Sequence, residues 1–183
     1  MQIKFEQVNY IYQPGTVNAC QALQEISLEI PDGELTAVIG HGGSGKSTLS
    51  LLMAGLYQPT SGQVKVGGRV KSNANAFRQV ALVFQYPEQQ LFGESVFEEV
   101  AFGARNYGTP EDYLNIKVRQ ALVQVGLEPD LFWHRSPFSL SGGQKRRVCI
   151  ASMLVFEPRV IILDEPTAGL DEGGRVWMME LIK

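Results

Sequence analysis

The sequence is poor in cysteine, lacks long apolar runs and carries little excess charge. Only two of its 183 residues are cysteines, Cys20 and Cys149, and they give neither a disulfide framework nor the spacing of metal ligands, so a reduced, intracellular setting is expected. Apolar runs such as Val160–Leu163 are far too short to span a bilayer. Met1–Gln7 has no charged start leading into an apolar run, so no signal peptide is expected. The net charge of −3 weighs against nucleic acid as a partner, because phosphate backbones usually meet a basic protein face.

The composition and patterning that are present are those of a globular α/β protein. Hydrophobic residues make up 44% of the chain and charged residues 19%, which is ordinary for a folded domain. Alternation of apolar and polar residues in Ile3–Tyr12 and Leu23–Ile30 predicts two strands of an antiparallel sheet with one exposed face. Continuous apolar stretches predict buried strands at Leu35–Gly40, Val80–Gln85 and Arg159–Glu165.

Helices are predicted where capping residues precede a helical pattern. Ser95 begins one such stretch, and Thr109 begins another with Pro110 at the expected first helical position. A helix is expected over Ser141–Phe156 and a last one after Asp171. These elements give a strand–loop–helix framework with a helical insert between two halves of a mostly parallel sheet. The last helix has no terminating signal, so the chain is expected to be truncated.

The stretch GHGGSGKST, here called the phosphate loop (Gly40–Thr48), fits the pattern G-x-x-x-x-G-K-[ST]. It stands between a predicted strand and a predicted helix, which is the context that this pattern requires. Glycines let backbone N–H groups converge on phosphate oxygens, and the helix start adds positive potential. Lys46 is expected to reach the β and γ phosphates of a bound nucleotide and to act in catalysis, and Ser47 to ligate Mg²⁺. The residues of the loop predicted to contact the nucleotide are Gly40, His41, Gly42, Gly43, Ser44, Gly45, Lys46, Ser47 and Thr48, although His41 by its residue type is an ordinary loop residue.

Two acidic residues close the predicted strand VIILDE. Ligands of α/β proteins bind beyond the carboxyl ends of strands, so Asp164 is expected to hold Mg²⁺. Glu165 is then placed to polarise the attacking water as the catalytic base. Gln85 ends another predicted strand and, taken alone, is an ordinary polar strand end. Beside a nucleotide its amide carbonyl is expected to reach Mg²⁺ and the water, which makes Gln85 a predicted catalytic, ATP-contacting and metal-binding residue.

The sequence SLSGGQKRRV, at Ser139–Val148, predicts a second anion site. Ser141 and Gln144 have the spacing of a capping box, so the helix is expected to start at Ser141. The cations Lys145–Arg147 then crowd the positive end of the helix dipole, where ordinary electrostatics disfavours them. Such a helix start favours a docked anion, although a capped helix with its cations on solvated faces is the alternative for these residues alone. The residues expected to face the anion are Ser141, Gly142, Gly143 and Gln144.

Taken together, these motifs resemble the ATP-binding cassette (ABC) ATPases. The resemblance rests on the phosphate loop, on LSGGQ at Leu140–Gln144, on ILDEPTAGLD at Ile162–Asp171 and on Gln85, and their order and spacing match across essentially the whole chain. It implies that AGLD forms a loop that crosses to a partner subunit, and that the helix start at Ser141 faces the γ phosphate held by the partner's phosphate loop. Tyr12 corresponds to the aromatic residue that stacks on adenine, whereas the residue alone is equally compatible with packing in the core of the sheet.

The fold implied by this resemblance is an α/β P-loop core with a mostly parallel sheet, an antiparallel β subdomain and a helical insert, all in one domain over residues 1–183. The β subdomain is expected at about 1–34 and 61–70, the nucleotide-binding core at 35–60, 71–86 and 141–183, and the helical subdomain at 87–140 with the signature at its end. The family's switch histidine would lie beyond Lys183, and His134 precedes the signature. The chain as given is therefore expected to bind ATP but to hydrolyse it poorly.

A narrower resemblance is to the ATPase subunits of energy-coupling-factor transporters, which import vitamins and transition-metal ions. It rests on FQYPEQQLFGESVFEEVAFGARNYG, on RSPFSLSGGQKRRVCIASML and on the style of the phosphate loop. It implies a second ATPase subunit, identical or not, and a transmembrane subunit that contacts the segment Tyr86–Phe92. It also implies a place at the cytoplasmic face of the cell membrane.

Two other classes of function stay open from the sequence. One is a cassette protein that acts on DNA or ribosomes, which the acidic balance disfavours, as does the absence of heptads in Gln85–Leu140 for the DNA-repair type. The other is a regulatory nucleotide-binding module without turnover, which the presence of Lys46, Asp164 and Glu165 disfavours. A small-molecule kinase is excluded, because it has no use for LSGGQ.

Overall fold

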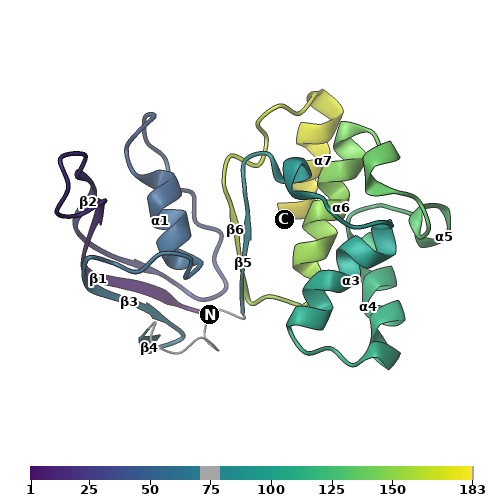
Figure 1. Cartoon of the computed structure of the whole chain (residues 1–183), viewed down its shortest axis with the longest axis horizontal. Coiled ribbons are helices and arrows are strands. Elements are labelled where there is room, and N and C mark those ends of the chain that lie inside the picture. Colours follow the sequence, from purple (N-terminus) through teal and green to yellow (C-terminus); the bar gives the residue numbers. More distant parts are fainter. Residues whose placement is uncertain (71–78, 183) are drawn as a thin grey trace. The chain divides into compact units, whose positions relative to one another are not determined.

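The computed structural model describes residues 1–70 and 79–182, which form two compact units, Met1–Leu82 and Val83–Lys183 (Figure 1). Part of the predicted core segment 71–86, residues 71–78, lies outside the described residues. The arrangement of three interleaved parts in one domain stays a prediction.

A four-stranded antiparallel sheet in the order β2-β1-β3-β4 forms the framework of the first unit. Its strands are β1 (Ile3–Tyr12), β2 (Cys20–Ile30), β3 (Ser61–Val66) and β4 (Arg69–Val70). β1 lies between β2 and β3 and pairs with both in antiparallel register. The antiparallel sheet predicted from the alternation of residues is confirmed.

Helix α1 (Lys46–Met53) packs on this sheet against β2 and β3. Figure 1 shows the helix on one side of the sheet. Leu49 and Leu52 are buried in the helix, and Phe5 and Val64 are buried in the sheet. Burying a side chain of this size contributes about 1.5–3 kcal/mol to folding. The helix is therefore held in place mainly by its packing, because no side chain caps its start at Gly45.

The predicted buried strand at Leu35–Gly40 is absent. These residues belong to no strand, and Leu35 and Ile39 are 78% and 92% exposed. A strand is stable only where a neighbour satisfies its backbone N–H and C=O groups, and the four-stranded sheet of this unit offers the segment no such neighbour. The apolar pattern alone did not reveal this lack of a partner.

A second, two-stranded sheet pairs β5 (Val80–Val83) with β6 (Val160–Leu163) in parallel. All four residues of β5 are buried, as predicted, but Ile161 in β6 is 44% exposed. Because β6 has one neighbouring strand among the described residues, part of it stays open to solvent. Both strands form within their predicted ranges, but they end two residues earlier than predicted, at Val83 and Leu163, and the burial of β6 was overestimated.

Helices make up most of the second unit, and Figure 1 shows α3, α4, α6 and α7 side by side in it. Buried residues of α3, α4 and α6, such as Val100, Leu122 and Val148, form a common apolar core with Met178 of α7. The elements are η1 (Pro87–Gln90), α3 (Val96–Asn106), α4 (Glu111–Gln124), α5 (Pro129–Phe132), η2 (Pro137–Ser139), α6 (Gly142–Leu154) and α7 (Glu172–Ile182).

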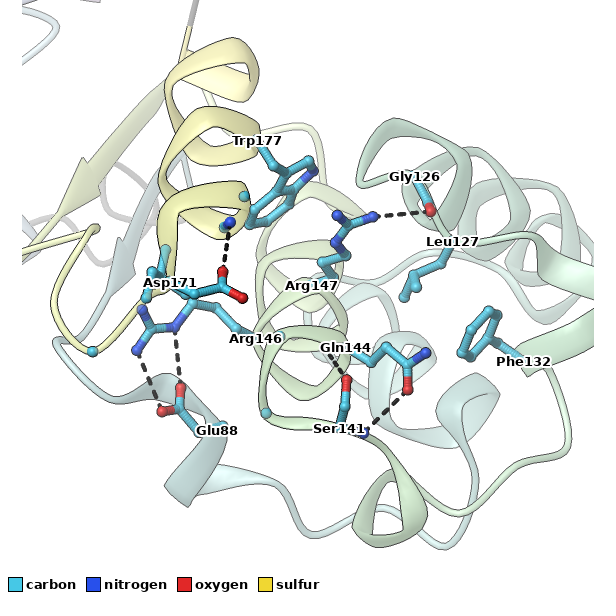
Figure 2. A pocket seen from close by; sticks show the side chains of 16 residues that line it. Glu88, Gly126, Leu127, Phe132, Ser141, Gln144, Arg146, Arg147, Asp171 and Trp177 are labelled. Atoms are coloured by element: carbon cyan, nitrogen blue, oxygen red, sulfur yellow. Dashed lines mark hydrogen bonds and ion pairs between the residues drawn. The ribbon is translucent and has the colours of Figure 1, made fainter.

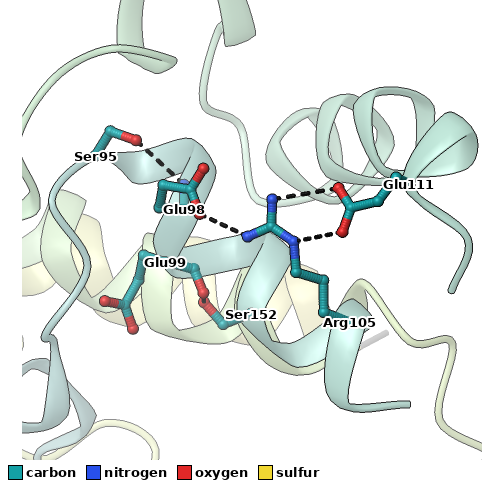
Figure 3. Close-up of polar contacts among 6 residues, drawn as sticks. All are labelled: Ser95, Glu98, Glu99, Arg105, Glu111 and Ser152. Atoms are coloured by element: carbon teal, nitrogen blue, oxygen red, sulfur yellow. Dashed lines mark hydrogen bonds and ion pairs between the residues drawn. The ribbon is translucent and has the colours of Figure 1, made fainter. Parts of the chain in front are cut away.

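Two of the predicted helix starts can be compared directly with the structure. The hydroxyl oxygen of Ser95 accepts a hydrogen bond from the backbone N–H of Glu98 at 3.2 Å, which confirms Ser95 as the cap of α3 (Figure 3). The start of α4 was predicted one residue too early. Pro110 has an extended backbone, with ψ of 144°, so it occupies the cap position itself and the helix begins at Glu111.

Arg105 joins α3 to α4 on the surface of the second unit. Its guanidinium donates to Glu98 at 2.6 Å and to Glu111 at 2.9 Å (Figure 3). These two carboxylates raise the pKa of Arg105 above its ordinary value. The group is partly exposed, so its contribution to stability is small.

Glu99 anchors the chain segment that leads into α3. The side chain is buried, and its Oε2 accepts hydrogen bonds from the backbone N–H groups of Phe92 and Gly93 at 2.9 and 2.6 Å. A Cβ atom at Gly93 would lie 2.8 Å from the backbone nitrogen of Glu99, so only glycine fits there. The end of the segment Tyr86–Phe92 is thereby fixed against α3.

Within residues 1–70 and 79–182, no helix combines the length and the apolar character needed to cross a lipid bilayer.

Candidate functional site: a phosphate loop and a signature helix

The phosphate loop leads directly into α1 in the first unit. Gly45 occupies the cap position with φ of 89°, and no side chain covers the backbone N–H groups of the first turn. The Nζ atom of Lys46 donates to the carbonyl oxygens of Gly40 and His41 at 2.8 and 2.9 Å. The positive charge thus lies over the loop, beside N–H groups that are free of side-chain caps, which is an arrangement suited to phosphate oxygens.

Glycine is required at Gly45 for two separate reasons. Its positive φ is unfavourable for other residues, and a Cβ atom there would lie 2.8 Å from the carbonyl oxygen of Ala22. Gly42 and Gly43 differ from Gly45 in the space around them, because an added Cβ would meet nothing within 4 Å, although Gly43 also has a positive φ, of 77°. These two positions leave the outer face of the loop open to a ligand.

Tyr12 lies near the carboxyl end of the phosphate loop and also in a cluster of tyrosines. Its hydroxyl is 2.9 Å from Oγ1 of Thr48. Its ring packs edge-on against Tyr10 and Tyr57, at centroid distances of 4.9 and 6.0 Å, and those two rings stack on each other. Burial raises the pKa of the Tyr10 phenol, with smaller contributions from its two neighbours. The structure thus shows Tyr12 packed among tyrosines and bonded to the phosphate loop, and its stacking on adenine stays a prediction.

In the second unit, Gln85 and Glu165 meet beyond the ends of β5 and β6. The amide nitrogen of Gln85 donates to Oε2 of Glu165 at 2.5 Å, which leaves the amide carbonyl of Gln85 free to accept from or coordinate another group. Asp164 directly follows β6, and its backbone N–H donates to the carbonyl of Val83 at 3.0 Å. Asp164 and Glu165 are therefore at the carboxyl end of the strand, as predicted.

Glu165 has a backbone conformation that is uncommon for a residue with a side chain. Its φ is 47°, in the left-handed region, and its carbonyl accepts a hydrogen bond from the N–H of Ala168 at 3.0 Å. Non-glycine residues in this region cost about 1–3 kcal/mol and persist where the surroundings fix them. The turn Glu165–Ala168 thus aims the carboxylate toward Gln85 at an energetic cost.

The predicted capping box at the start of α6 is confirmed. The hydroxyl of Ser141 accepts from the N–H of Gln144 at 3.3 Å, and the N–H of Ser141 donates to Oε1 of Gln144 at 3.1 Å (Figure 2). A Cβ atom at Gly142 or Gly143 would meet nothing within 4 Å, so this helix start faces open space. It borders a cavity of about 670 Å³ in the second unit, which the start of α7 also lines.

Two of the three cations after the signature are bound within the protein rather than left on a solvated face. Arg147 donates to the carbonyls of Val125 and Gly126 at 3.4 and 3.2 Å, and its guanidinium lies 4.6 Å from the ring centre of Trp177 (Figure 2). Arg146 is paired with Glu88 (Figure 2). The sequence could not show these partners, because they lie 20 or more residues away along the chain.

Comparison with known protein families decides the assignment of the fold. The family described as ABC transporter matches residues 23–168, which include the phosphate loop, Gln85, the signature and Glu165. The chain belongs to the ABC transporter family. The resemblance to ABC ATPases that the sequence motifs indicated is thereby confirmed for the family.

Curated relatives of this ABC transporter family chain bear the name energy-coupling factor transporter ATP-binding protein EcfA2. The protein of Lactococcus lactis subsp. cremoris is 50% identical over 188 residues, and that of Symbiobacterium thermophilum is 54% identical over 187 residues. The matches cover 99% and 100% of this chain and 65% of each relative. The chain thus spans about two thirds of the length of these relatives.

Solved ABC structures have the same fold as this chain. The cbiO1 protein of Clostridium perfringens, described as part of the ABC transporter complex cbiONQ, superposes with a TM-score of 0.83 at 40% identity and covers 98% of this chain and 71% of its own. The dimeric cassette MJ0796 in a post-hydrolysis state with ADP and Pi superposes with a TM-score of 0.84 at 28% identity, covering 98% of this chain and 81% of its own.

The predicted ABC site residues fall into two groups that the structure describes separately. The first unit holds Tyr12 and the phosphate loop, and the second holds Gln85, Asp164, Glu165 and the signature. A magnesium site shared by Ser47, Gln85 and Asp164 therefore stays a prediction. Among the described residues, no group of three or more His, Cys, Asp or Glu side chains could hold a metal by itself. Sequence reasoning assigned no role to Tyr10 or Tyr57, and it did not predict that Arg146 is buried and paired with Glu88.

Proposed function

We propose that the protein is the ATP-binding and ATP-hydrolysing subunit of a membrane transporter of the energy-coupling-factor type. The observation that carries the proposal is the presence of two complementary halves of an ATP site in one chain. The first half is the phosphate loop with its uncapped helix start, and the second is the open, capped start of α6 at Ser141. Relatives about 50% identical over the whole chain carry the corresponding name.

In this proposal the phosphate loop binds the triphosphate of ATP. Backbone N–H groups at Gly42–Lys46 would surround phosphate oxygens, and Lys46 would exchange its bonds to Gly40 and His41 for bonds to the β and γ phosphates. Tyr12 would stack on the adenine from the edge of the tyrosine cluster. The distance of 2.9 Å between Tyr12 and Thr48 supports this arrangement, because it joins the aromatic ring to the end of the loop.

The proposed residues for magnesium are of the type that this ion prefers. Ser47 offers a hydroxyl, Asp164 a carboxylate and Gln85 an amide carbonyl that its bond to Glu165 leaves free. All three donors are oxygens, as Mg²⁺ requires. When bound, the ion would neutralise charge that develops on the phosphates.

Hydrolysis would depend on the pair Gln85 and Glu165. Glu165 would accept a hydrogen bond from the attacking water and take up its proton, and Gln85 would hold the carboxylate in place through the bond of 2.5 Å. The turn at Glu165 supports this role, because its hydrogen bond from Ala168 fixes the backbone while the carboxylate accepts from Gln85. The rest of the catalysis would come from Lys46 and from N–H groups that stabilise charge on the phosphoryl group.

The open start of α6 calls for a second cassette. In the proposal, Ser141 and the glycines after it contact the γ phosphate held by the phosphate loop of a second ATPase subunit, identical or not. ATP would thereby join two cassettes, and hydrolysis would release them, which converts phosphate chemistry into subunit motion. The dimeric form of the similar cassette MJ0796 supports this arrangement.

The proposed contact with the transmembrane subunit is the segment Tyr86–Phe92, here called the docking segment. Tyr86 and Phe92 are 43% and 57% exposed, and the ring of Phe92 lies edge-on to the exposed Phe102 at 4.7 Å. Glu99 fixes the backbone of Phe92, so the aromatic residues are presented in a defined position. Through this segment the protein would lie at the cytoplasmic face of a membrane and energise the import of a vitamin or a transition-metal ion.

Co-purification tests this proposal most broadly. The full-length protein is expressed with an affinity tag in its own organism, solubilised in mild detergent and isolated, and the bound proteins are identified. The proposal predicts an integral membrane protein and a second ATPase, with ATP hydrolysis in the purified complex. Recovery of ribosomal RNA and ribosomal proteins in their place would contradict it.

A further inference from the structure

Arg146 is a buried arginine on α6, just after the signature. It is 3% exposed, and its guanidinium makes four hydrogen bonds. Two go to the carboxylate of Glu88, at 3.2 and 3.3 Å (Figure 2). The others go to backbone carbonyls, with Nη1 donating to Ala168 at 2.7 Å and Nη2 donating to Gln85 at 3.3 Å. One side chain thus joins three segments that are far apart in the sequence.

Together with two further hydrogen bonds, the bonds from Arg146 to the two carbonyls form a closed ring of contacts that includes Glu165, the proposed catalytic residue. The side chain of Gln85 donates to Glu165, and the carbonyl of Glu165 accepts from the N–H of Ala168. The carbonyls of Ala168 and Gln85 then both accept from Arg146. Glu165 is thus fixed through its side chain by Gln85 and through its backbone by Ala168, and Arg146 donates to the backbone carbonyls of both of these residues.

The chemistry of an arginine suits this position. The guanidinium is planar and always charged, and its donors form a rigid fork that can bind several acceptors at fixed angles. A buried charge is costly unless it is paired, and Glu88 supplies the pairing charge from η1. Bonds from a charged donor are stronger than neutral ones, and the bond to the carbonyl of Ala168 is short, at 2.7 Å. The bond to the carbonyl of Gln85 is longer, at 3.3 Å, and comes from the nitrogen that also donates to Glu88.

We propose that Arg146 is a positioning residue for ATP hydrolysis, which sets the spacing between Gln85 and Glu165 and ties that pair to the docking segment through Glu88. This inference depends on the proposed function, because it assigns a role within the hydrolysis step. Arg146 does not touch the nucleotide in this account. It holds the backbone on both sides of the pair while the start of α6, one turn earlier, contacts the γ phosphate of the second cassette.

A purely structural role for Arg146 predicts a different pattern of effects. If the arginine only stabilised the second unit, its loss would lower the melting temperature and would reduce ATP binding, dimerisation and turnover together. A positioning role predicts a selective loss of kcat. Placing a reacting group wrongly by about 1 Å can cost about a hundredfold in rate without changing the binding of substrate.

The test uses the full-length protein in its purified complex and compares Arg146→Gln with wild type. We expect kcat to fall about tenfold or more, and KM for ATP and ATP-dependent dimerisation to change by less than about threefold. Arg146→Lys keeps the positive charge beside Glu88, but one ammonium group cannot span both carbonyls, so it should recover only a small part of kcat. The double variant Glu88→Gln with Arg146→Gln removes both charges of the pair, so neither is left buried without a partner. Its kcat should stay as low as that of Arg146→Gln, because the hydrogen bonds from the guanidinium to the two carbonyls are still missing.

Arg105→Gln is the matched control, because it removes an arginine with two carboxylate partners from the same unit (Figure 3). It should leave kcat within about twofold of wild type. Arg146 variants with wild-type kcat, or with ATP binding and turnover lost in equal proportion, would overturn the inference while the proposed function stands. A wild-type complex that does not hydrolyse ATP would overturn the proposed function, and the inference with it.

Discussion

The amide nitrogen of Gln85 donates to Oε2 of Glu165 across 2.5 Å, and 80 residues of chain separate the two side chains. The bond fixes the carboxylate at the carboxyl end of β6 and uses the nitrogen of the amide, so that the oxygen of Gln85 stays available. Gln85 and Glu165, each just beyond the end of a strand, thus form a hydrogen-bonded pair. The predictions below depend on the roles proposed for this pair, for the phosphate loop and for the start of α6.

Replacing Glu165 with glutamine should leave ATP binding intact and nearly abolish turnover. The change removes the group that takes up the proton of the attacking water, a contribution of about a hundredfold or more. Steady-state release of phosphate and equilibrium binding of ATP by the full-length protein measure the two effects. Glu128→Gln is the matched control and should behave as wild type, because Glu128 is exposed and its side chain makes no capping hydrogen bond at the start of α5. A Glu165→Gln protein that hydrolyses ATP at the wild-type rate would remove Glu165 from the mechanism.

Replacing Tyr12 separates its two interpretations. Tyr12→Phe keeps the ring but loses the partly buried hydroxyl bond to Thr48, so ATP affinity should change by less than about threefold, as for one hydrogen bond within the protein. Tyr12→Ala removes the stacking surface and should weaken ATP binding about tenfold, since aromatic stacking contributes about 1–3 kcal/mol per base in nucleic-acid complexes. Titration of the full-length protein with a fluorescent ATP analogue measures both. Equal affinity of the alanine variant and wild type, with a lower melting temperature, would show that Tyr12 serves only in packing.

The two cysteines should differ sharply in their reactivity with pH. Burial, helped by the negative charges of Glu99 and Glu88, raises the pKa of the Cys149 thiol from 9.0 to about 12, whereas Cys20 is exposed. Only the thiolate reacts with alkylating agents, so at pH 8 one thiol per chain should be labelled quickly and the second only after unfolding. The Cys20→Ala variant should lose the rapid phase.

The same shift predicts how stability depends on pH. Between pH 9 and about 12 the thiol of Cys149 ionises in the unfolded chain but stays protonated in the folded one. The unfolded state therefore loses a proton first, and the free energy of unfolding should fall as pH rises through this window. Cys149→Ala should remove this part of the pH dependence in urea unfolding curves. Rapid labelling of both thiols at pH 8 in the folded protein would contradict the burial of Cys149.

Much of the candidate site could be predicted from the sequence, because it depends on local rules. A capping box needs only Ser141 and Gln144 three residues apart, and the structure confirms it. The placement of Asp164 and Glu165 after β6 follows from a short apolar run that ends in two acids. Features of this kind are set by neighbouring residues, so their spacing along the chain is sufficient.

The features that the sequence did not reveal depend on distant partners. Arg146 resembles any other cation in a basic helix start until Glu88, 58 residues earlier, is brought beside it. The exposed Leu35–Gly40 has the composition of a buried strand, but a strand also needs a neighbour that composition cannot supply. The start of α4 was predicted only one residue too early, with Thr109 as the cap. Pro110 has an extended ψ of 144°, so Pro110 is the cap and the helix begins at Glu111.

The most direct test of the account is the molar mass of the cassettes with and without ATP. Light scattering is applied to the full-length protein with Glu165→Gln, alone and with the second ATPase that co-purifies with it. The account predicts one chain without ATP, two chains with ATP, and one chain again when Ser141→Arg is added, because the arginine fills the open start of α6. Ser141→Ala separates loss of the serine from blocking of the helix start: it should lower stability by about 1 kcal/mol through loss of the cap and weaken the contact with the γ phosphate, but it adds no bulk and should still allow two chains with ATP. A mass that does not change with ATP, or that doubles despite Ser141→Arg, would contradict the two-cassette site.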